Sequence, residues 1–175
     1  KEVGCRINEH AAKISEGQKW IKRVVAEMGG KNAIIVDSSA NIKKAAQGIA
    51  SSAFTFQGQK CSACSRAIVM SDVYDELVDA VVEEAKKLKA DQGAGRDNAA
   101  IGPVINQNAY NNITSYIEVG RKEGTIVYGG TYSDEKGYFV DPTVIRDIKR
   151  DARIANEEIF GPVLAVIKVD SFDEA

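Results

Sequence analysis

Apolar residues recur along the chain with two different spacings, and these spacings alternate. A four-residue interval joins Val3, Ile7 and Ala11, and similar intervals over residues 42–53, 73–88 and 107–122 predict four amphipathic helices in all. Short apolar runs rich in β-branched residues predict strands at residues 20–28, 31–36, 66–70, 125–128, 138–145 and 164–169. Strands that alternate with helices favour an α/β fold, with a largely parallel sheet and flanking helices.

Polar residues and prolines suggest where these elements begin and end. We expect Asp37, Ser38 and Ser39 to cap one helix and Ser71-Asp72 to cap the next. Pro142 indicates an edge strand or a bulge within residues 138–145. The polar, glycine-rich residues 90–98 predict a loop, and a further helix is expected to begin at Ser171. Both chain ends fall inside predicted helices, so we expect a piece of a longer protein.

The composition excludes several classes of protein. Hydrophobic residues make up 44% of the chain, charged residues 27%, and the net charge is -2, which is ordinary for a globular protein. No basic face for nucleic acid or for an anionic membrane is evident, and no apolar run approaches the roughly 18 residues of a membrane span. Three cysteines are too few for a disulfide scaffold, which favours a reducing compartment such as the cytoplasm.

The single histidine, His10, limits the chemistry that the chain can perform. It lies on the first predicted helix beside Glu9, where we expect a solvated side chain. Ser-His and Cys-His catalytic pairs are therefore disfavoured, and a carboxylate or a lysine would have to accept protons.

The strongest candidate for chemistry is Cys61, in the segment FTFQGQKCSACSR at residues 54–66. The predicted helix runs into a glycine-containing turn, the turn presents the cysteine, and a strand follows. Neighbouring Lys60 and backbone amides favour the thiolate, which attacks carbonyl carbon well. Cys64 is expected to be a small buried residue. A dithiol redox pair of Cys61 and Cys64, or a zinc site, remains an alternative at this point.

Two further segments are weaker candidates. Glu27 is followed by Met28 and two glycines, which would leave room for the backbone to approach a ligand closely. Residues 156–162 (NEEIFGP) combine acidic residues, an aromatic residue and a Gly-Pro turn, which suits a loop that grips a ligand.

Taken together and in this order, these segments resemble the signature of the aldehyde dehydrogenase superfamily. The opening residues KEVG resemble the end of that family's phosphate-binding turn, and GPV at 102–104 and GYFVDP at 137–142 match further family landmarks. The resemblance covers essentially the whole chain. Within the superfamily, GQKCSACSR at 58–66 and RDN at 96–98 are most similar to the branch that oxidises the proline-derived glutamate γ-semialdehyde to glutamate, alone or within a bifunctional protein.

The resemblance implies a domain division and a role for each candidate residue. Residues 1–27 would be the remnant of an NAD-binding domain, and residues 28–175 the catalytic domain. It implies NAD as cofactor, a small aldehyde as substrate, no metal, and a homo-oligomer. The implied roles are nucleophile for Cys61, activation of water for Glu27, binding of the substrate carboxylate for Ser62, and binding of the cofactor for Val3, Met28, Glu158 and Phe160.

The chain also departs from the family pattern. The amide side chain that completes the family's oxyanion hole and the lysine that binds the adenosine ribose have no counterpart here, and Asp91-Gln-Gly stands where Gly-Asp-Pro is usual. We therefore expect the chain by itself to be inactive. Retention of Glu27 favours hydrolysis of a thioester over its transfer to coenzyme A, and the other rivals are a non-catalytic structural fragment and a thiol redox protein.

Overall fold

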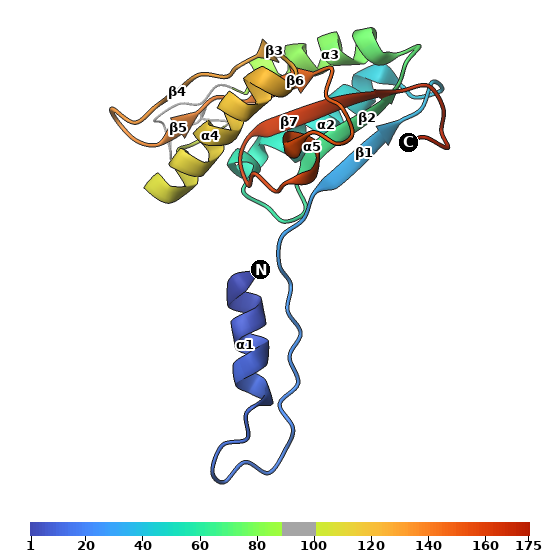
Figure 1. The fold of residues 1–175 in the computed structure, drawn as a ribbon. Helices are drawn as coiled ribbons and strands as arrows, with labels where there is room; N and C mark the ends of the chain where they lie inside the picture. Colours follow the sequence, from blue (N-terminus) through green and yellow to red (C-terminus); the bar gives the residue numbers. More distant parts are fainter. Residues whose placement is uncertain (89–100) are drawn as a thin grey trace. The chain divides into compact units, whose positions relative to one another are not determined.

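The computed structural model describes residues 1–88 and 101–175 (Figure 1). The chain divides into two compact units, Lys1–Gly30 and Lys31–Ala175, and each is described by itself. The predicted loop at 90–98, with its Asp91 and Arg96 motifs, lies outside the described residues.

The first unit holds one helix, α1 (Glu2–Ala12), as the four-residue apolar spacing predicts. The predicted strand at residues 20–28 is wrong, because the backbone there is extended but pairs with no strand in the described chain. Its apolar side chains are left in solvent, with Trp20 81% exposed and Val25 90% exposed. A β-strand needs a neighbour that accepts its backbone hydrogen bonds, and this unit supplies none.

The second unit is built on a five-stranded sheet. Its four parallel strands are, in spatial order, β1 (Asn32–Val36), β2 (Cys64–Met70), β7 (Val163–Val169) and β6 (Thr143–Arg146), and β3 (Thr125–Tyr128) closes the sheet antiparallel to β6. The predicted α/β class with a largely parallel sheet is confirmed. The separate two-stranded sheet pairs β4 (Tyr132–Ser133) with β5 (Phe139–Val140).

Pro142 divides the predicted strand in two. Before it, β5 belongs to a two-stranded sheet and is an edge strand, whereas β6, after it, lies inside the five-stranded sheet between β7 and β3. Because the proline precedes the first residue of β6, the ladder loses no backbone donor: Thr143 N–H bonds to Pro162 O at 2.8 Å.

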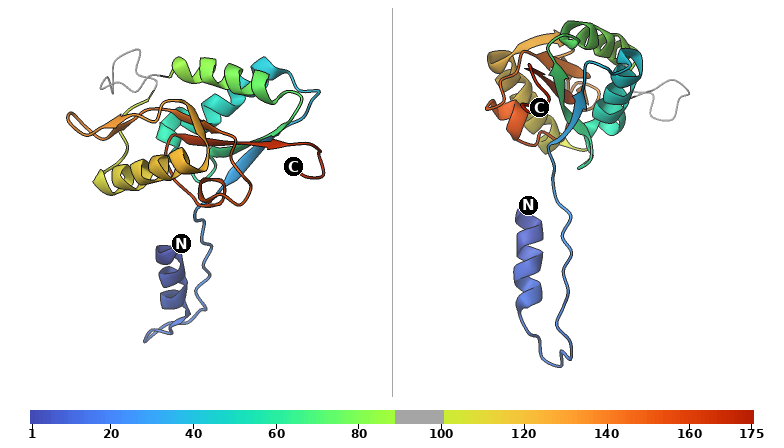
Figure 2. Two further views of the ribbon diagram at one scale, coloured as in Figure 1. Left: turned by 45° about the horizontal axis from the view of Figure 1, so that its top comes forward. Right: turned by 90° about the vertical axis from the view of Figure 1, so that its right-hand side faces the viewer.

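Helices cover the two faces of the sheet (Figure 2). α2 (Ile42–Phe54) and α3 (Tyr74–Lys86) pack on one face, whereas α4 (Gln107–Glu123) and the short α5 (Arg153–Asn156) pack on the other. Along β7, Leu164 and Val166 point towards α2 and α3, and Ala165 and Ile167 point towards α4 and α5. This double burial explains why the strand reads as a continuous apolar run.

The two predicted helix caps are wrong. Asn41 caps α2, its side chain accepting a bond from a backbone N–H of the first turn at 3.0 Å. The Asp37 carboxylate is already engaged with the backbone and hydroxyl of Ser39. Asp72 accepts instead from the Ser38 hydroxyl at 2.8 Å, and α3 begins without a side-chain cap. Several polar residues compete for one cap in this sequence, and tertiary contacts decide between them.

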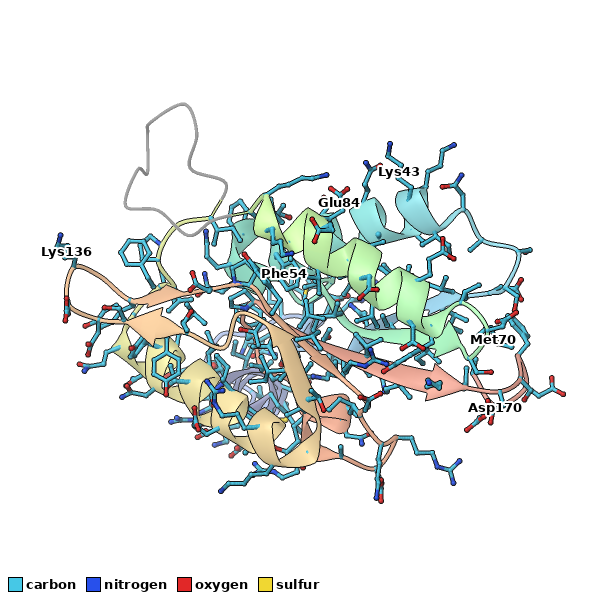
Figure 3. The ribbon with its side chains drawn as sticks, turned by 90° about the horizontal axis from the view of Figure 1, so that it is seen from above. Lys43, Phe54, Met70, Glu84, Lys136 and Asp170 are labelled. Atoms are coloured by element: carbon cyan, nitrogen blue, oxygen red, sulfur yellow. The ribbon has the colours of Figure 1, made fainter. Side chains whose placement is uncertain are left out.

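Because β1, β2, β7 and β6 are parallel, their carboxyl ends all lie on the same side of the sheet. Met70 and Asp170, at the ends of β2 and β7, lie near one another in Figure 3, and Ser71 N–H bonds to Val169 O at 2.8 Å. The loops that enter the strands therefore gather at the opposite edge. Residues 171–175 form one turn, closed by Ala175 N–H bonding to Ser171 O at 3.1 Å. None of the helices in the described ranges has the length and apolarity needed to cross a bilayer.

Candidate active site

Three loops meet at the amino ends of neighbouring parallel strands. Lys31 leads into β1, residues 55–63 lead into β2, and residues 157–162 lead into β7. Because β1, β2 and β7 are adjacent, the Cys61 segment and the acidic segment come together, although about 100 positions separate them in the sequence.

A strained turn brings two of these loops into contact. Phe56, Gln57 and Gly58 all have positive φ, at 60°, 58° and 64°. A Cβ on Gly58 would stand 2.3 Å from the Gly161 carbonyl oxygen and 2.9 Å from that of Ala53, so only glycine fits. The Gly-Gln-Lys-Cys segment and the Glu-Ile-Phe-Gly-Pro segment are thus in backbone contact.

Cys61 presents an exposed thiol on a fixed backbone. Its carbonyl oxygen accepts a bond from the Asn32 side-chain amide at 2.8 Å, which ties the turn to the start of β1. The neighbouring Lys60 ammonium bonds to the Thr55 hydroxyl at 3.3 Å. Ser62, the predicted substrate-binding residue, is exposed beside Cys61. A reagent in solution can therefore reach both side chains.

Cys64 is buried, as the sequence predicts, with 3% of its surface exposed. Its thiol donates to Arg66 O at 3.3 Å, and its backbone N–H bonds to the Ser52 hydroxyl at 3.1 Å. Burial raises the pKa of the Cys64 thiol to about 11, so it stays protonated near neutrality. All three cysteines are free thiols, and a buried neutral partner disfavours the dithiol redox alternative.

In the segment at residues 157–162, buried or anchored positions alternate with exposed side chains. Ile159 is 3% exposed, and its carbonyl accepts from the Asn112 side chain at 3.2 Å. Gly161 packs so closely on the Ile113 side chain that a Cβ would lie 2.5 Å from it. Glu158 and Phe160, on either side of Ile159, are exposed. Phe160 adopts a positive φ of 57°. The two predicted cofactor-binding residues therefore project from an immobilised loop.

Glu157, which precedes them, is held by two side chains that the sequence did not single out. Tyr116 Oη donates to Glu157 at 2.6 Å, and Arg153 donates through Nε at 3.0 Å and Nη2 at 2.8 Å. The Arg153 guanidinium also lies 5.5 Å from the centre of the Tyr116 ring. Hydrogen bonds from Arg153 and then Tyr116 lower the pKa of Glu157 to about 2. Arg153 and Glu157 are four residues apart, a spacing that allows an ion pair, but no local pattern reveals Tyr116, which comes from another helix.

Lys31, which directly precedes β1, carries a buried cationic group. Lys31 Nζ is shielded from solvent and has no hydrogen-bond partner among the described residues, while Arg66 Nη2 donates to the Lys31 carbonyl at 2.7 Å. Burial, followed by the Arg66 charge, lowers the pKa of Lys31 to about 8, although Glu158 and Glu157 oppose the shift. The positive charges of Lys31 and Arg66 are therefore near the acidic residues of the loop.

The remaining predicted residues lie in the first unit, which is described by itself. Val3 and Met28 are 69% and 42% exposed, and Glu27 is exposed beside Met28. A Cβ on Gly4 would lie 2.8 Å from Met28 Sδ, so the two predicted cofactor-binding segments are neighbours within this unit. His10 is exposed on α1, as predicted. The role of Glu27 in activating water and those of Val3 and Met28 in binding the cofactor stay predictions.

A metal centre finds no support in the part of the chain that the structure covers. Among residues 1–88 and 101–175, no three His, Cys, Asp or Glu side chains are grouped to hold an ion.

Comparison with known proteins decides the family. The chain matches the aldehyde dehydrogenase family over residues 1–175, its whole length. The chain belongs to the aldehyde dehydrogenase family. The resemblance carried by the three ordered motifs is thus confirmed, and so is the fold that it implies.

Several members of the aldehyde dehydrogenase family are similar along the entire chain. A Geobacillus protein (strain WCH70) named 1-pyrroline-5-carboxylate dehydrogenase is 54% identical over 175 residues, covering all of this chain and 34% of the relative. A Thermus 1-pyrroline-5-carboxylate dehydrogenase, solved with bound NAD, has a TM-score of 0.90 and 46% identity over 99% of this chain and 33% of that one. Proline utilization A from Bdellovibrio bacteriovorus has a TM-score of 0.91 and 42% identity, covering 98% and 18%. The chain spans about a third of the length of the curated relatives it matches.

Proposed function

We propose that the protein carrying this sequence oxidises L-glutamate γ-semialdehyde to glutamate with NAD, through a thioester on Cys61. Support for the nucleophile is the exposed Cys61 thiol on a turn that Gly58, Gly161 and Asn32 hold in place. Support for the substrate is the shared name of the similar Geobacillus and Thermus proteins, 1-pyrroline-5-carboxylate dehydrogenase.

The first half of the reaction builds the thioester. The Cys61 sulfur attacks the aldehyde carbon, its thiol proton leaves, and a thiohemiacetal oxyanion forms. The Cys61 backbone N–H stabilises this oxyanion, because a donor aimed at developing charge lowers the barrier. Exposed Ser62 binds the substrate's α-carboxylate. Hydride then leaves the carbon, the oxyanion collapses, and Cys61 carries an acyl group.

The second half releases glutamate. Glu27 takes a proton from a water molecule, the resulting hydroxide attacks the acyl carbon, and the C–S bond breaks to regenerate the Cys61 thiolate. A carboxylate suits this role because the only histidine, His10, is a solvent-exposed residue of α1. Water, one aldehyde and one oxidised cofactor thus give one carboxylate, one reduced cofactor and protons.

The loop at residues 157–162 would bind the nicotinamide end of NAD. The exposed Glu158 carboxylate accepts hydrogen bonds from the ribose hydroxyls, and the exposed Phe160 ring lies beside the nicotinamide. Val3 lines the adenine pocket, and the Met28 backbone meets the nicotinamide amide. Bound NAD supplies the hydride acceptor. The NAD-bound Thermus relative supports this choice of cofactor.

We further propose a cytoplasmic homo-oligomer that uses no metal ion. Three free cysteines suit a reducing compartment, and the thioester mechanism requires only a thiol, a carboxylate and the nicotinamide.

The test is NADH production by the protein carrying this sequence, offered glutamate γ-semialdehyde or a short aliphatic aldehyde. We expect the semialdehyde to be preferred and Cys61→Ala to lower the rate at least about a thousandfold, because the covalent step is lost. Cys64→Ala is the matched control, since that thiol is buried and neutral, and it should remain active. Inactivity on both aldehydes, or an active Cys61→Ala variant, would overturn the proposal.

A further inference from the structure

The carboxylate of Glu157 has no assigned role, yet it has the strongest set of polar contacts near the candidate site. It accepts one bond from Tyr116 and two from Arg153. Those two residues come from α4 and α5, so the carboxylate joins both helices to the loop. We define Tyr116, Arg153 and Glu157 as the carboxylate clamp.

The clamp itself is supported from behind. The Glu123 carboxylate, at the end of α4, accepts bonds at 3.0 Å from the backbone N–H groups of Arg153 and Ile154, which open α5. Glu157 N–H bonds to Arg153 O at 2.7 Å and ends that helix. The position of the clamp arginine is therefore set by backbone contacts as well as by its side chain.

Glu158 lies between two fixed points. The clamp holds Glu157 on one side, and the burial of Ile159 with its bond from Asn112 holds the other side. A residue between two anchored neighbours has little freedom to move its backbone, so its side chain is presented in one direction. Phe160 is fixed similarly, between Ile159 and the Gly161 contact with Ile113.

We propose that Tyr116, Arg153 and Glu157 are positioning residues that set the affinity for NAD by holding Glu158 and Phe160 in their binding orientation. The proposal rests on the proposed function, because it assigns Glu158 and Phe160 to the cofactor. The clamp touches neither substrate nor cofactor. It acts by reducing the conformational freedom that the loop would otherwise lose when the cofactor binds.

The same helix offers a matched control. Glu118, also on α4, accepts from Arg121 Nε at 3.1 Å and from Tyr132 Oη at 3.3 Å, so it too joins an arginine and a tyrosine. That group joins α4 to β4, and among the hydrogen bonds of residues 1–88 and 101–175 it makes none to residues 157–162. Glu118→Gln therefore removes a carboxylate of the same kind without loosening the cofactor loop.

The test measures the dissociation constant of NAD for the protein carrying this sequence and for its Glu157→Gln, Tyr116→Phe and Glu118→Gln variants. We expect Glu157→Gln to weaken NAD binding about two- to fivefold, which is the range for a well-placed exposed ion pair, and Tyr116→Phe to weaken it less. Combining the two should give less than the sum of their effects, because both disrupt one group. Glu118→Gln should bind NAD like the wild type.

Two further readouts separate positioning from general damage. The rate at which iodoacetamide alkylates Cys61 without NAD should be the same in all variants, and the KM for the aldehyde should change less than the KM for NAD. Unchanged NAD affinity in Glu157→Gln, or equal loss in Glu118→Gln, would overturn the clamp proposal while leaving the dehydrogenase proposal intact. If the wild type binds no NAD and makes no NADH, the proposed function itself has failed.

Discussion

Lys31 illustrates how a single buried charge can lower the stability of the folded protein. Its ammonium nitrogen is buried without a hydrogen bond, and the Arg66 side chain, which bonds its carbonyl, adds like charge nearby. Burying an ammonium in this way disfavours the charged form unless carboxylates compensate. The acidic residues Glu157 and Glu158 compensate only in part, since the pKa of Lys31 remains lowered to about 8.

This arrangement predicts a specific pH dependence of stability. The ordinary pKa of lysine is 10.5 and the folded-state pKa of Lys31 is about 8, so between these values the unfolded chain holds more protons. The contribution of Lys31 to the free energy of unfolding should therefore rise from about pH 8 to about pH 10.5. Lys31→Met should be more stable than the wild type at pH 7, by on the order of 1 kcal/mol, because it removes a buried charge.

Chemical denaturation at pH 7 and at pH 10 would measure the difference in the free energy of unfolding between the wild type and Lys31→Met. The stability advantage of Lys31→Met should shrink at the higher pH, because the wild-type lysine has then lost its charge. An advantage that stays constant between the two pH values would contradict the assignment of the buried charge. Lys43→Met is a suitable control, since Lys43 is exposed on α2.

At the scale of elements, the change from glycine to alanine should have opposite effects on stability within α2 and in the turn that follows it. Gly58→Ala should destabilise the protein by more than about 2 kcal/mol, because the new Cβ meets the Gly161 carbonyl and φ is positive. Gly48→Ala should instead stabilise it by about 0.5–1 kcal/mol, because Gly48 lies within α2 and the added Cβ would have no neighbour within 4 Å beyond the adjacent residues and the local helix backbone. Thermal unfolding of the two variants compares them directly, and equal shifts would contradict the contact at Gly58.

The elements that the sequence predicts well are those whose apolar positions are all buried or half-buried within the described chain, on one face for α4 and on both faces for β7. The helix at 107–122 and the strand at 164–169 match α4 and β7 closely, because their apolar periods report burial directly. The segment at 20–28 has the same strand-like composition, yet it forms no strand, because composition does not supply a hydrogen-bonding neighbour.

Some residues of the candidate site could likewise be predicted from the sequence, and others could not. Cys61, Glu158 and Phe160 could be found because they lie in contiguous motifs, and the structure shows their side chains exposed on fixed loops. Asn32 and Tyr116 could not be found in this way. Their contacts join positions 32 with 61 and 116 with 157, and no local period encodes such a pairing.

At the scale of the whole second unit, the order of the strands predicts where the backbone is most protected. β7 lies between β2 and β6 and is covered on both faces, whereas the β4–β5 hairpin, with Lys136 near its tip in Figure 3, belongs to a separate two-stranded sheet. Amide hydrogen exchange followed by mass spectrometry should therefore be slowest in β7 and β2 and fastest in the hairpin. Comparable exchange in β7 and in the hairpin would contradict this topology.

The contact between Gly58 and Gly161 also has a consequence for the order in which the molecule assembles. A chain made from its amino end completes the cysteine-bearing turn more than one hundred positions before its partner carbonyl exists. Closing so long a loop has an entropic cost, and this cost is offset only when β7 pairs with β2 and β6. We therefore expect the Cys61 turn to reach its final conformation late, so that its contact with Gly161 forms only when the sheet is complete.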